Sequence, residues 1–315
     1  MAVTEEASPA DGNPATGATS LRPVDLLLLG YLGFASIVAL ARHETTGRGW
    51  LLLSNGLTLL LVLLLARNEH GRFGRALREI YPILLLTSLY GGLDLLSGGG
   101  TVPVHDAQVQ RWEATLFGGQ PSRDWWRAAP SQLWSLILHG AYFSYYAIVL
   151  LPAVLLLARQ QLGALRRLML ALMATFVFCY LWFVLFPVAG PYYEFPRPSG
   201  AFVDNPAARL VYRTLAAGSS YGAAFPSSHV AASVAVTIGC WRVSRRLGLA
   251  LAPLTALLTV AVVYCQMHYA VDALAGLVAG AVFGGTLTSG RSAVKRGPGA
   301  DRSPLATRAS VLTER

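Results

Sequence analysis

Charged residues are scarce in this sequence. Only 13% of its 315 residues are Asp, Glu, Lys or Arg, whereas soluble domains carry roughly 25%. Hydrophobic residues make up 54%, and the mean hydropathy is +0.49. The composition therefore argues against an ordinary soluble domain and predicts an integral membrane protein.

Cysteine is also rare. The three cysteines, Cys179, Cys240 and Cys265, lie in apolar stretches and form neither a CxxC pair nor a metal-ligand spacing. We interpret them as small buried hydrophobic residues. The sequence also lacks a cluster of carboxylates, so we expect neither a metal ion nor another cofactor.

The two ends lack apolar runs. Residues 1–21 are rich in Ala, Gly, Pro, Thr and Ser, and residues 290–315 are similar with scattered Arg. Neither segment can bury enough surface to order itself, so we expect two disordered tails. The N-terminus has no basic segment followed by an apolar core, so we expect no signal-peptide cleavage.

Long apolar runs fill the rest of the chain. A helix that crosses the hydrocarbon needs ~20 mostly apolar residues. Eight stretches qualify or nearly qualify: 24–41, 50–66, 80–97, 132–158, 168–189, 225–241, 248–266 and 268–288. The last two are nearly continuous, which predicts a tight turn around Gln266 and Met267. We expect an all-α polytopic helical bundle, with seven spans if one early stretch is re-entrant.

Positive charge indicates the orientation of these spans. With a cytoplasmic N-terminus, 17 of the 25 Lys and Arg residues fall in cytoplasmic segments and the other 8 fall outside. Every short cytoplasmic loop is basic, as the positive-inside rule predicts. The net charge of +9 is therefore a topology signal and does not indicate nucleic-acid binding. Both termini are expected in the cytoplasm of a cell with a bacterial type of plasma membrane.

Two long loops, 98–131 and 190–224, are expected on the outer side. In residues 105–119, Val109, Trp112 and Leu116 share one helical face, with Trp125 and Trp126 nearby. This pattern predicts a short helix lying in the membrane interface. It would serve either as an aromatic anchor or as the rim through which a lipid enters.

Two segments carry the residues suited to chemistry. In AAFPSSHVAAS (223–233), Pro226 and the small polar Ser227 and Ser228 predict a helix start, whose free N–H groups can hold a phosphate beside His229. In MHYAVDALAG (267–276), His268 and Asp272 stand at i and i+4 on one helix face. The carboxylate would accept the Nδ1 proton and leave Nε2 free to attack.

The interval between the histidines places them at the same depth. From His229 the chain crosses inward, turns at Arg242–Arg246 and returns to His268. Each arm of ~16–18 residues covers ~25 Å, which is close to one hydrocarbon thickness. Ionisable groups within a membrane are costly and usually functional. We therefore expect both imidazoles in one site at the outer face.

PSSH (226–229) and HYAVD (268–272) resemble the last two signature motifs of the type-2 phosphatidic acid phosphatase superfamily. FPVAGPYYEF (186–195), the HYAVD form and LFGGQP (116–121) look most like the branch that contains inositol phosphorylceramide synthase and its bacterial relatives. The resemblance implies a six-helix catalytic membrane domain in residues 80–289, preceded by two transmembrane helices in residues 22–79. The tails 1–21 and 290–315 flank these parts.

The resemblance also implies roles for the matching residues. His268 would be the nucleophile that forms a phosphohistidine, His229 the general acid and Asp272 the residue that orients His268. Ser227, Ser228 and the adjacent amides would hold phosphate oxygens. The substrates would be membrane lipids: a phosphate-bearing donor and a lipid or polyol acceptor.

Two departures from the phosphatases concern cations. The phosphatases have a Lys seven residues before an Arg-Pro pair and an Arg six residues before the third-motif histidine. Here Arg197–Pro198 exists, but the two positions hold Gly190 and Val262. A phosphomonoester carries about −1.5 to −2 charge and a diester only one, so fewer cations favour a diester substrate. Arg197 and Arg213 are the candidate replacements, or else ordinary loop arginines.

Other polar residues also fall in the outer half of the bundle. Asp94, His139, Tyr192 and Tyr193 are candidate substrate contacts, with interhelical hydrogen bonding as the alternative for the first two. We expect a lipid phosphotransferase. The alternatives are a polyprenyl or lipid phosphate phosphatase and, as a minor one, a transporter or scaffold. A transporter would show broken helices and midplane charges, whereas the polar groups here gather at the outer rim.

Overall fold

The structure is a computed structural model that describes residues 21–42, 47–67, 71–97, 100 and 102–289. The predicted tails therefore lie outside the described residues, apart from the end of the first. Within these ranges the chain is helical and contains no strand longer than an isolated bridge between Val188 and Ala223. The helices are α1 (Pro23–Ala41), α2 (Arg48–Arg67), α3 (Gly71–Leu84), α4 (Leu86–Leu96), α5 (Asp106–Phe117), α6 (Pro121–Ala128), α7 (Gln132–Phe143), α8 (Tyr145–Ala158), α9 (Leu162–Leu185), α10 (Pro191–Glu194), the 3-10 turn η1 (Gly200–Phe202), α11 (Pro206–Gly218), α12 (Ser228–Val243), α13 (Arg245–Tyr264) and α14 (Ala270–Leu287).

Seven helical segments of the described chain are long and apolar enough to cross a membrane. They are α1, α2, α3 with α4, α7 with α8, α9, α13 and α14. This result confirms the all-α polytopic fold, and the chain is a multi-pass membrane protein. The division predicted at residue 79 falls inside α3.

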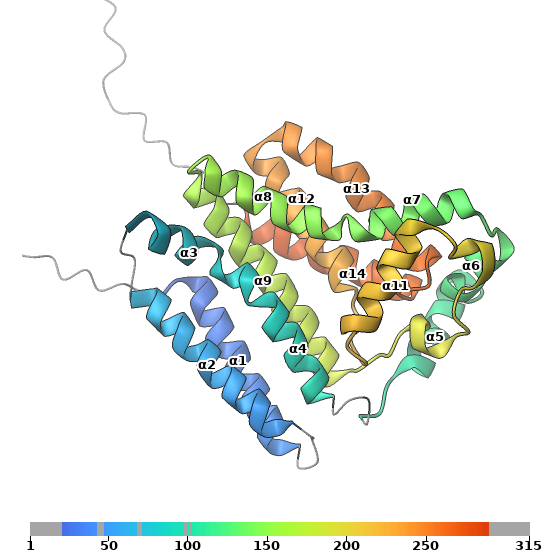
Figure 1. Ribbon diagram of the computed structural model, residues 1–315, viewed down its shortest axis with the longest axis horizontal. Coiled ribbons are helices and arrows are strands. Elements are labelled where there is room, and N and C mark those ends of the chain that lie inside the picture. Colours follow the sequence, from blue (N-terminus) through green and yellow to red (C-terminus); the bar gives the residue numbers. More distant parts are fainter. Residues whose placement is uncertain (1–20, 43–46, 68–70, 98–99, 101, 290–315) are drawn as a thin grey trace, which may run out of the picture.

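The sixth predicted stretch, 225–241, differs from the expectation. It forms α12, which has 16 residues and spans about 24 Å. The helix begins only at Ser228, because residues 221–227 are non-helical. α12 packs against α8, α9, α13 and α14, which makes it the central helix of the C-terminal half (Figure 1).

Small residues let α14 approach α12 closely. Gly276, Gly280 and Gly284 recur every fourth residue on α14 and face the backbone of α12. A Cβ on Gly284 would lie 2.8 Å from the Cα of Ala235, which is closer than real Cβ contacts allow. The spacing matches the small-xxx-small pattern of close helix pairs in membranes.

We predict that Gly280→Ala destabilises the protein by about 1–3 kcal/mol, because the added methyl group would overlap the backbone at Ala231. Gly285→Ala is the matched control, since no atom outside its own helix lies within 4 Å of a Cβ there. Thermal unfolding of the two variants in the same detergent tests the prediction. Equal melting temperatures would contradict the close packing of α12 and α14.

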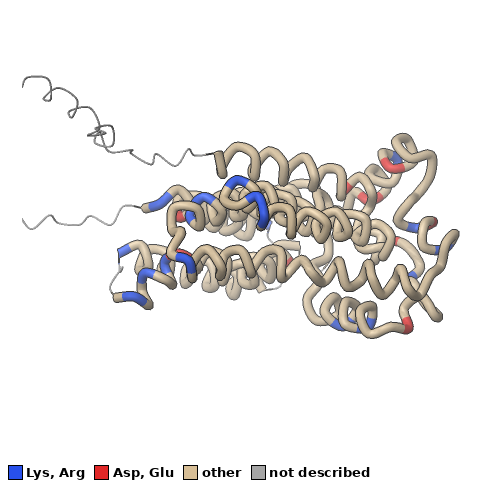
Figure 2. Tube along the Cα trace, turned by 90° about the horizontal axis from the view of Figure 1, so that it is seen from above, with Lys and Arg blue, Asp and Glu red and all other residues tan. Residues whose placement is uncertain are grey.

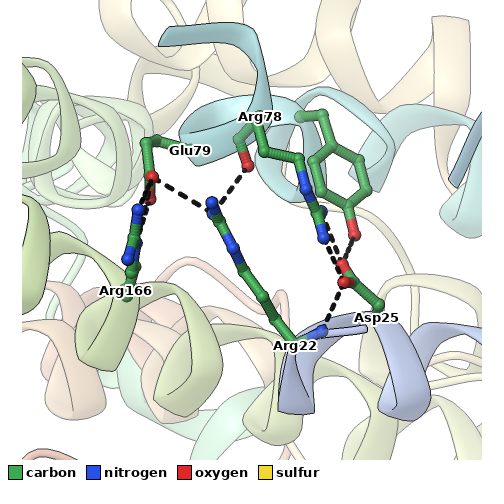
Figure 3. Close-up of polar contacts among 6 residues, drawn as sticks. Arg22, Asp25, Arg78, Glu79 and Arg166 are labelled. Atoms are coloured by element: carbon green, nitrogen blue, oxygen red, sulfur yellow. Dashed lines mark hydrogen bonds and ion pairs between the residues drawn. The ribbon is translucent and has the colours of Figure 1, made fainter. Parts of the chain in front are cut away.

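An ionic cluster with buried carboxylates joins the starts of α1 and α9 to the middle of α3 (Figure 3). Asp25 on α1 accepts hydrogen bonds from Arg78, at 2.7 Å, and from Tyr81, both on α3. Glu79 binds Arg22 at 3.1 Å and Arg166 of α9 at 2.9 Å. Asp25 and Glu79 are buried. Removing one partner of a buried ion pair typically costs about 3–5 kcal/mol, so the cluster holds the N-terminal helices to the rest of the bundle.

The ionic cluster also defines one end of the molecule. Figure 2 shows a dense group of Lys and Arg at one end of the bundle. At the other end of α1, Arg42 donates hydrogen bonds to the carbonyls of Leu96, at 2.8 Å, and Val184, at 2.9 Å. Leu96 is the last residue of α4, and Val184 is the last but one of α9. The short helices α5, α6 and α10 lie beyond the end of the bundle marked by Arg42. Together with α11 they form a layer that we call the outer layer (Figure 1).

Candidate active site

The starts of α12 and α14 meet beneath the outer layer. The backbone N–H of Ser227, which caps α12, donates to the carbonyl of Asp272 in the first turn of α14 at 3.0 Å. This contact brings His229 and His268 together, with ring centroids 5.8 Å apart. The convergence expected from the length of the two helical arms is therefore present in the structure.

His268 does not lie on the helix face that the i, i+4 spacing suggested. It stands in the connection between α13 and α14, and α14 begins two residues later, at Ala270. Its Nδ1 lies 3.0 Å from the carbonyl oxygen of Ala224 but 3.5 Å from Oδ2 of Asp272. A carbonyl can only accept, so Nδ1 carries the proton and Nε2 keeps its lone pair. The expected tautomer is thus set chiefly by a backbone group.

Asp272 serves mainly as a cap. Its Oδ2 accepts a hydrogen bond from the backbone N–H of Tyr269 at 2.8 Å, in a capping-box arrangement at the start of α14. The carboxylate is fully buried, and its Oδ1 has no hydrogen-bond partner. Asp272 therefore holds the turn that carries His268, in addition to standing close to the imidazole.

His229 is held by tyrosines of α7 and α8. Its Nε2 lies 3.3 Å from the hydroxyl of Tyr142, and its ring packs 4.5 Å from the ring of Tyr145. The Nδ1 atom is buried without a hydrogen-bond partner. The hydroxyl of Tyr142 therefore aligns the imidazole that faces His268.

The serines before and at the start of α12 are buried. Ser227 is the N-cap, and its hydroxyl accepts from the N–H of Val230 at 3.4 Å. Ser228 is the first helical residue, so Pro226 lies before the helix and outside its first turn. The first N–H groups of a helix have no carbonyl partner within it, which gives α12 the anion-binding character expected from the sequence.

The two candidate arginines lie in the outer layer. Arg197 is exposed, with its guanidinium 4.5 Å above the ring of Tyr192. Arg213 is exposed on α11. Among the interactions of the described residues, neither has a hydrogen bond to His229 or His268. Arg127 donates to Oε1 of Gln266, in the turn before His268, at 3.1 Å.

The remaining candidates take different positions. Tyr193 is partly exposed and shares a hydrogen bond with Ser219 at 2.6 Å. Asp94 is exposed on α4. His139 is fully buried, with Nδ1 2.8 Å from the carbonyl of Ser135 and its ring packed near Phe202. Ser135 is on the same helix, and Nε2 of His139 is buried without a hydrogen-bond partner.

Helix α5 is the short helix predicted in residues 105–119, and of its apolar stripe only Val109 is buried. Trp112 and Leu116 are exposed on it, at 37% and 63%, whereas Asp106 and Glu113 are buried. These two carboxylates turn inward because two loops of the site direct backbone N–H groups toward α5. Asp106 accepts from Ala189 and Gly190, and Glu113 accepts from Ala270. The spacing of Asp106, Gln110 and Glu113 on one helical face could have indicated this buried polar face. The prediction of an interface helix used only the apolar stripe of the same helix.

Gln266 is a second residue missed by sequence reasoning. It is fully buried in a left-handed conformation, with φ of 59°. Its amide accepts from Trp126 at 3.0 Å and donates to the carbonyl of Pro191 at 3.1 Å. The predicted tight turn at Gln266 and Met267 is confirmed, and its side chain ties that turn to α6 and α10.

The structure is that of a polytopic membrane protein in which two histidines meet at paired helix starts. A family model described as the PAP2 superfamily matches residues 107–284, more than half of the chain. The chain therefore belongs to the PAP2 superfamily, a family of phosphatases and phosphotransferases, and is an enzyme of this type. The predicted superfamily is thereby confirmed. No curated protein and no solved structure matches the chain.

Proposed function

We propose that this enzyme is a lipid phosphotransferase that moves a phosphate-linked headgroup from a lipid phosphodiester to a hydroxyl acceptor. The observation that carries the proposal is the geometry of His268. Its Nδ1 is held by the carbonyl of Ala224, so Nε2 is the nitrogen left free to react, in a site that also holds His229. Such an imidazole is suited to nucleophilic attack.

The reaction has two halves. Nε2 of His268 forms a bond to phosphorus, the bond to the lipid alcohol breaks, and His229 donates a proton to the departing oxygen. The acceptor hydroxyl then attacks phosphorus, His229 takes its proton, and the bond to His268 breaks. The N–H groups at the start of α12, with Ser227 and Ser228, stabilise the charge on the phosphate oxygens. Asp272 holds the turn.

Two positions support a diester over a monoester. Gly190 stands where phosphatases of the superfamily carry Lys, with φ of +93°, and a Cβ there would lie 2.9 Å from Cβ of Ala224. The position therefore excludes a lysine. Val262 stands at the second cationic position and is fully buried. A site without these two cations suits the single charge of a diester. The inositol phosphorylceramide synthase type of transfer fits this requirement.

The outer layer supplies the proposed substrate contacts. Arg197 and Arg213 would meet the lipid phosphate as it arrives, and Tyr192 and Tyr193 would contact the headgroup. The basic end of the bundle lies away from the outer layer (Figure 2). Its Lys and Arg residues support an orientation with the basic end in the cytoplasm. The site would then face the extracytoplasmic side of the plasma membrane.

Product analysis tests the proposal. The purified protein is reconstituted with vesicles of ³²P-phosphatidylinositol, with or without ceramide as acceptor, and in parallel with ³²P-phosphatidic acid. We expect label in a new phosphodiester only when acceptor is present. Release of inorganic phosphate from phosphatidic acid, without transfer in any mixture, would overturn the transferase in favour of a lipid phosphatase.

A further inference from the structure

Asp106 binds two separate segments beside His268. Its Oδ2 accepts from the N–H of Ala189 at 2.7 Å, and its Oδ1 accepts from the N–H of Gly190 at 2.8 Å. Oδ1 also accepts from the hydroxyl of Tyr269 at 3.0 Å. The carboxylate is 2% exposed, so these bonds are protected from water. One side chain of α5 thus binds both the 188–190 segment and the residue next to His268.

The 188–190 segment is connected to the imidazole itself. The N–H of Ala224 donates to the carbonyl of Val188 at 2.9 Å. The carbonyl of Ala224 is in turn the partner of Nδ1 of His268 at 3.0 Å. A continuous series of hydrogen bonds therefore runs from Asp106 through this backbone pair to the nitrogen that sets the tautomer.

Glu113 binds the next residue of the chain after Tyr269. Its Oε1 accepts from the N–H of Ala270, the first residue of α14, at 2.7 Å. The carboxyl group is fully buried, and its Oε2 has no hydrogen-bond partner. Asp106 and Glu113 together bind the two residues that follow His268 and the 188–190 segment, from a helix outside the histidine motifs.

We propose that Asp106 and Glu113 are positioning residues for the reaction, which hold His268 in its reactive orientation from the outer layer. The proposal rests on the proposed function, since it assumes that His268 is the nucleophile. Among the described residues, neither carboxylate has a hydrogen bond to His229 or His268. Each acts through backbone N–H groups, so its removal should slow the chemical step and leave substrate binding nearly unchanged.

The first test uses Asp106. Asp106→Asn places an N–H donor against one of the two backbone donors, and we expect kcat to fall about 100-fold with a nearly unchanged KM. Tyr269→Phe removes only one of the bonds, and we expect a smaller loss of about 5–10-fold. This variant decides the question if Asp106→Asn does not fold. Asp204→Asn is the control, because this exposed carboxylate pairs with Arg209 at 2.7 Å, and it should keep wild-type kcat.

The second test separates the hydrogen bond of Glu113 from its charge. Burial raises the pKa of Glu113 to about 7, with help from the charges of Asp272 and Asp124 and against the N–H of Ala270. Those two acids face it from α14 and α6, and Asp106 is on its own helix. Glu113→Gln keeps an acceptor for Ala270, so we expect most of kcat to be retained, whereas Glu113→Leu should lose about 10–100-fold.

A pH profile of kcat distinguishes a positioning role of Glu113 from a loss of folded protein. The ionised carboxylate binds the N–H of Ala270 more strongly than the neutral acid does. The ratio of wild-type to Glu113→Gln kcat should therefore rise as the pH passes through about 7, the pKa of Glu113. A ratio that stays constant from pH 6 to 8 would overturn this role of Glu113.

The outcomes distinguish the two proposals. If His268→Ala retains activity, the proposed function fails. If His268→Ala is inactive while folded Asp106→Asn, Tyr269→Phe and Glu113→Leu all keep wild-type kcat, the positioning role fails and the proposed function stands. A raised KM with unchanged kcat in these variants would also overturn positioning, because it indicates a role in binding.

Discussion

His268→Ala should lower the rate of headgroup transfer by about 10⁴-fold or more while the protein remains folded. A nucleophile that forms a covalent intermediate has no substitute in the site, and its loss typically removes most of the rate enhancement. The imidazole is 5% exposed and bonded to a single backbone carbonyl, so its removal leaves the surrounding helices in place. Transfer from ³²P-phosphatidylinositol measures the rate, and acid-labile label on the protein reports the phosphohistidine.

His105→Ala is the matched control for this prediction. His105 is an outer-layer imidazole that stacks on Phe186 at 4.3 Å and precedes α5. We expect its removal to change the rate by no more than about three-fold, as for a side chain that makes no contact with reacting atoms. Retained transfer in His268→Ala, at full expression, would show that the nucleophile lies elsewhere.

His229→Gln should slow transfer from the lipid diester by about 10²–10⁴-fold, the usual contribution of a general acid. The loss should depend on the leaving group. A lipid alcohol leaves poorly without a proton, whereas p-nitrophenolate leaves readily without one. With a p-nitrophenyl phosphodiester as donor, the variant should therefore form the phosphohistidine at close to the wild-type rate.

The comparison of leaving groups also distinguishes the general-acid role of His229 from a role in phosphate binding alone. If His229 only bound phosphate, its substitution would slow both donors by the same factor, because both present the same phosphate oxygens. Equal losses with the lipid diester and the p-nitrophenyl diester would thus contradict the general-acid role. Tyr142→Phe removes the 3.3 Å contact to Nε2 and should give a weaker form of the same leaving-group dependence.

The histidine pair was accessible from the sequence because its position follows from distance along the chain. PSSH and HYAVD are separated by one inward and one outward helical arm, and a membrane fixes the length of each arm. The same regularity made most spans predictable. It was less exact at α12, because the chain remains non-helical up to Ser227 and the helix starts late.

The partner of His268 was not accessible in the same way. The i, i+4 spacing pointed to Asp272, but the turn before α14 places Nδ1 nearer to the carbonyl of Ala224. Every residue has a carbonyl, so no residue type marks the one that will accept this hydrogen bond. Its position depends on the pairing of the segments around Val188 and Ala223, which are distant in sequence.

The sequence by itself determined the membrane bundle, its basic end and the two histidine motifs, since each depends on composition or on local spacing. Only the tertiary structure decided which face of α5 turns inward. A stripe of Val109, Trp112 and Leu116 and a stripe of Asp106, Gln110 and Glu113 coexist on that helix. Because the site loops present backbone N–H groups there, burying the carboxylates satisfies donors that an apolar face would leave unpaired.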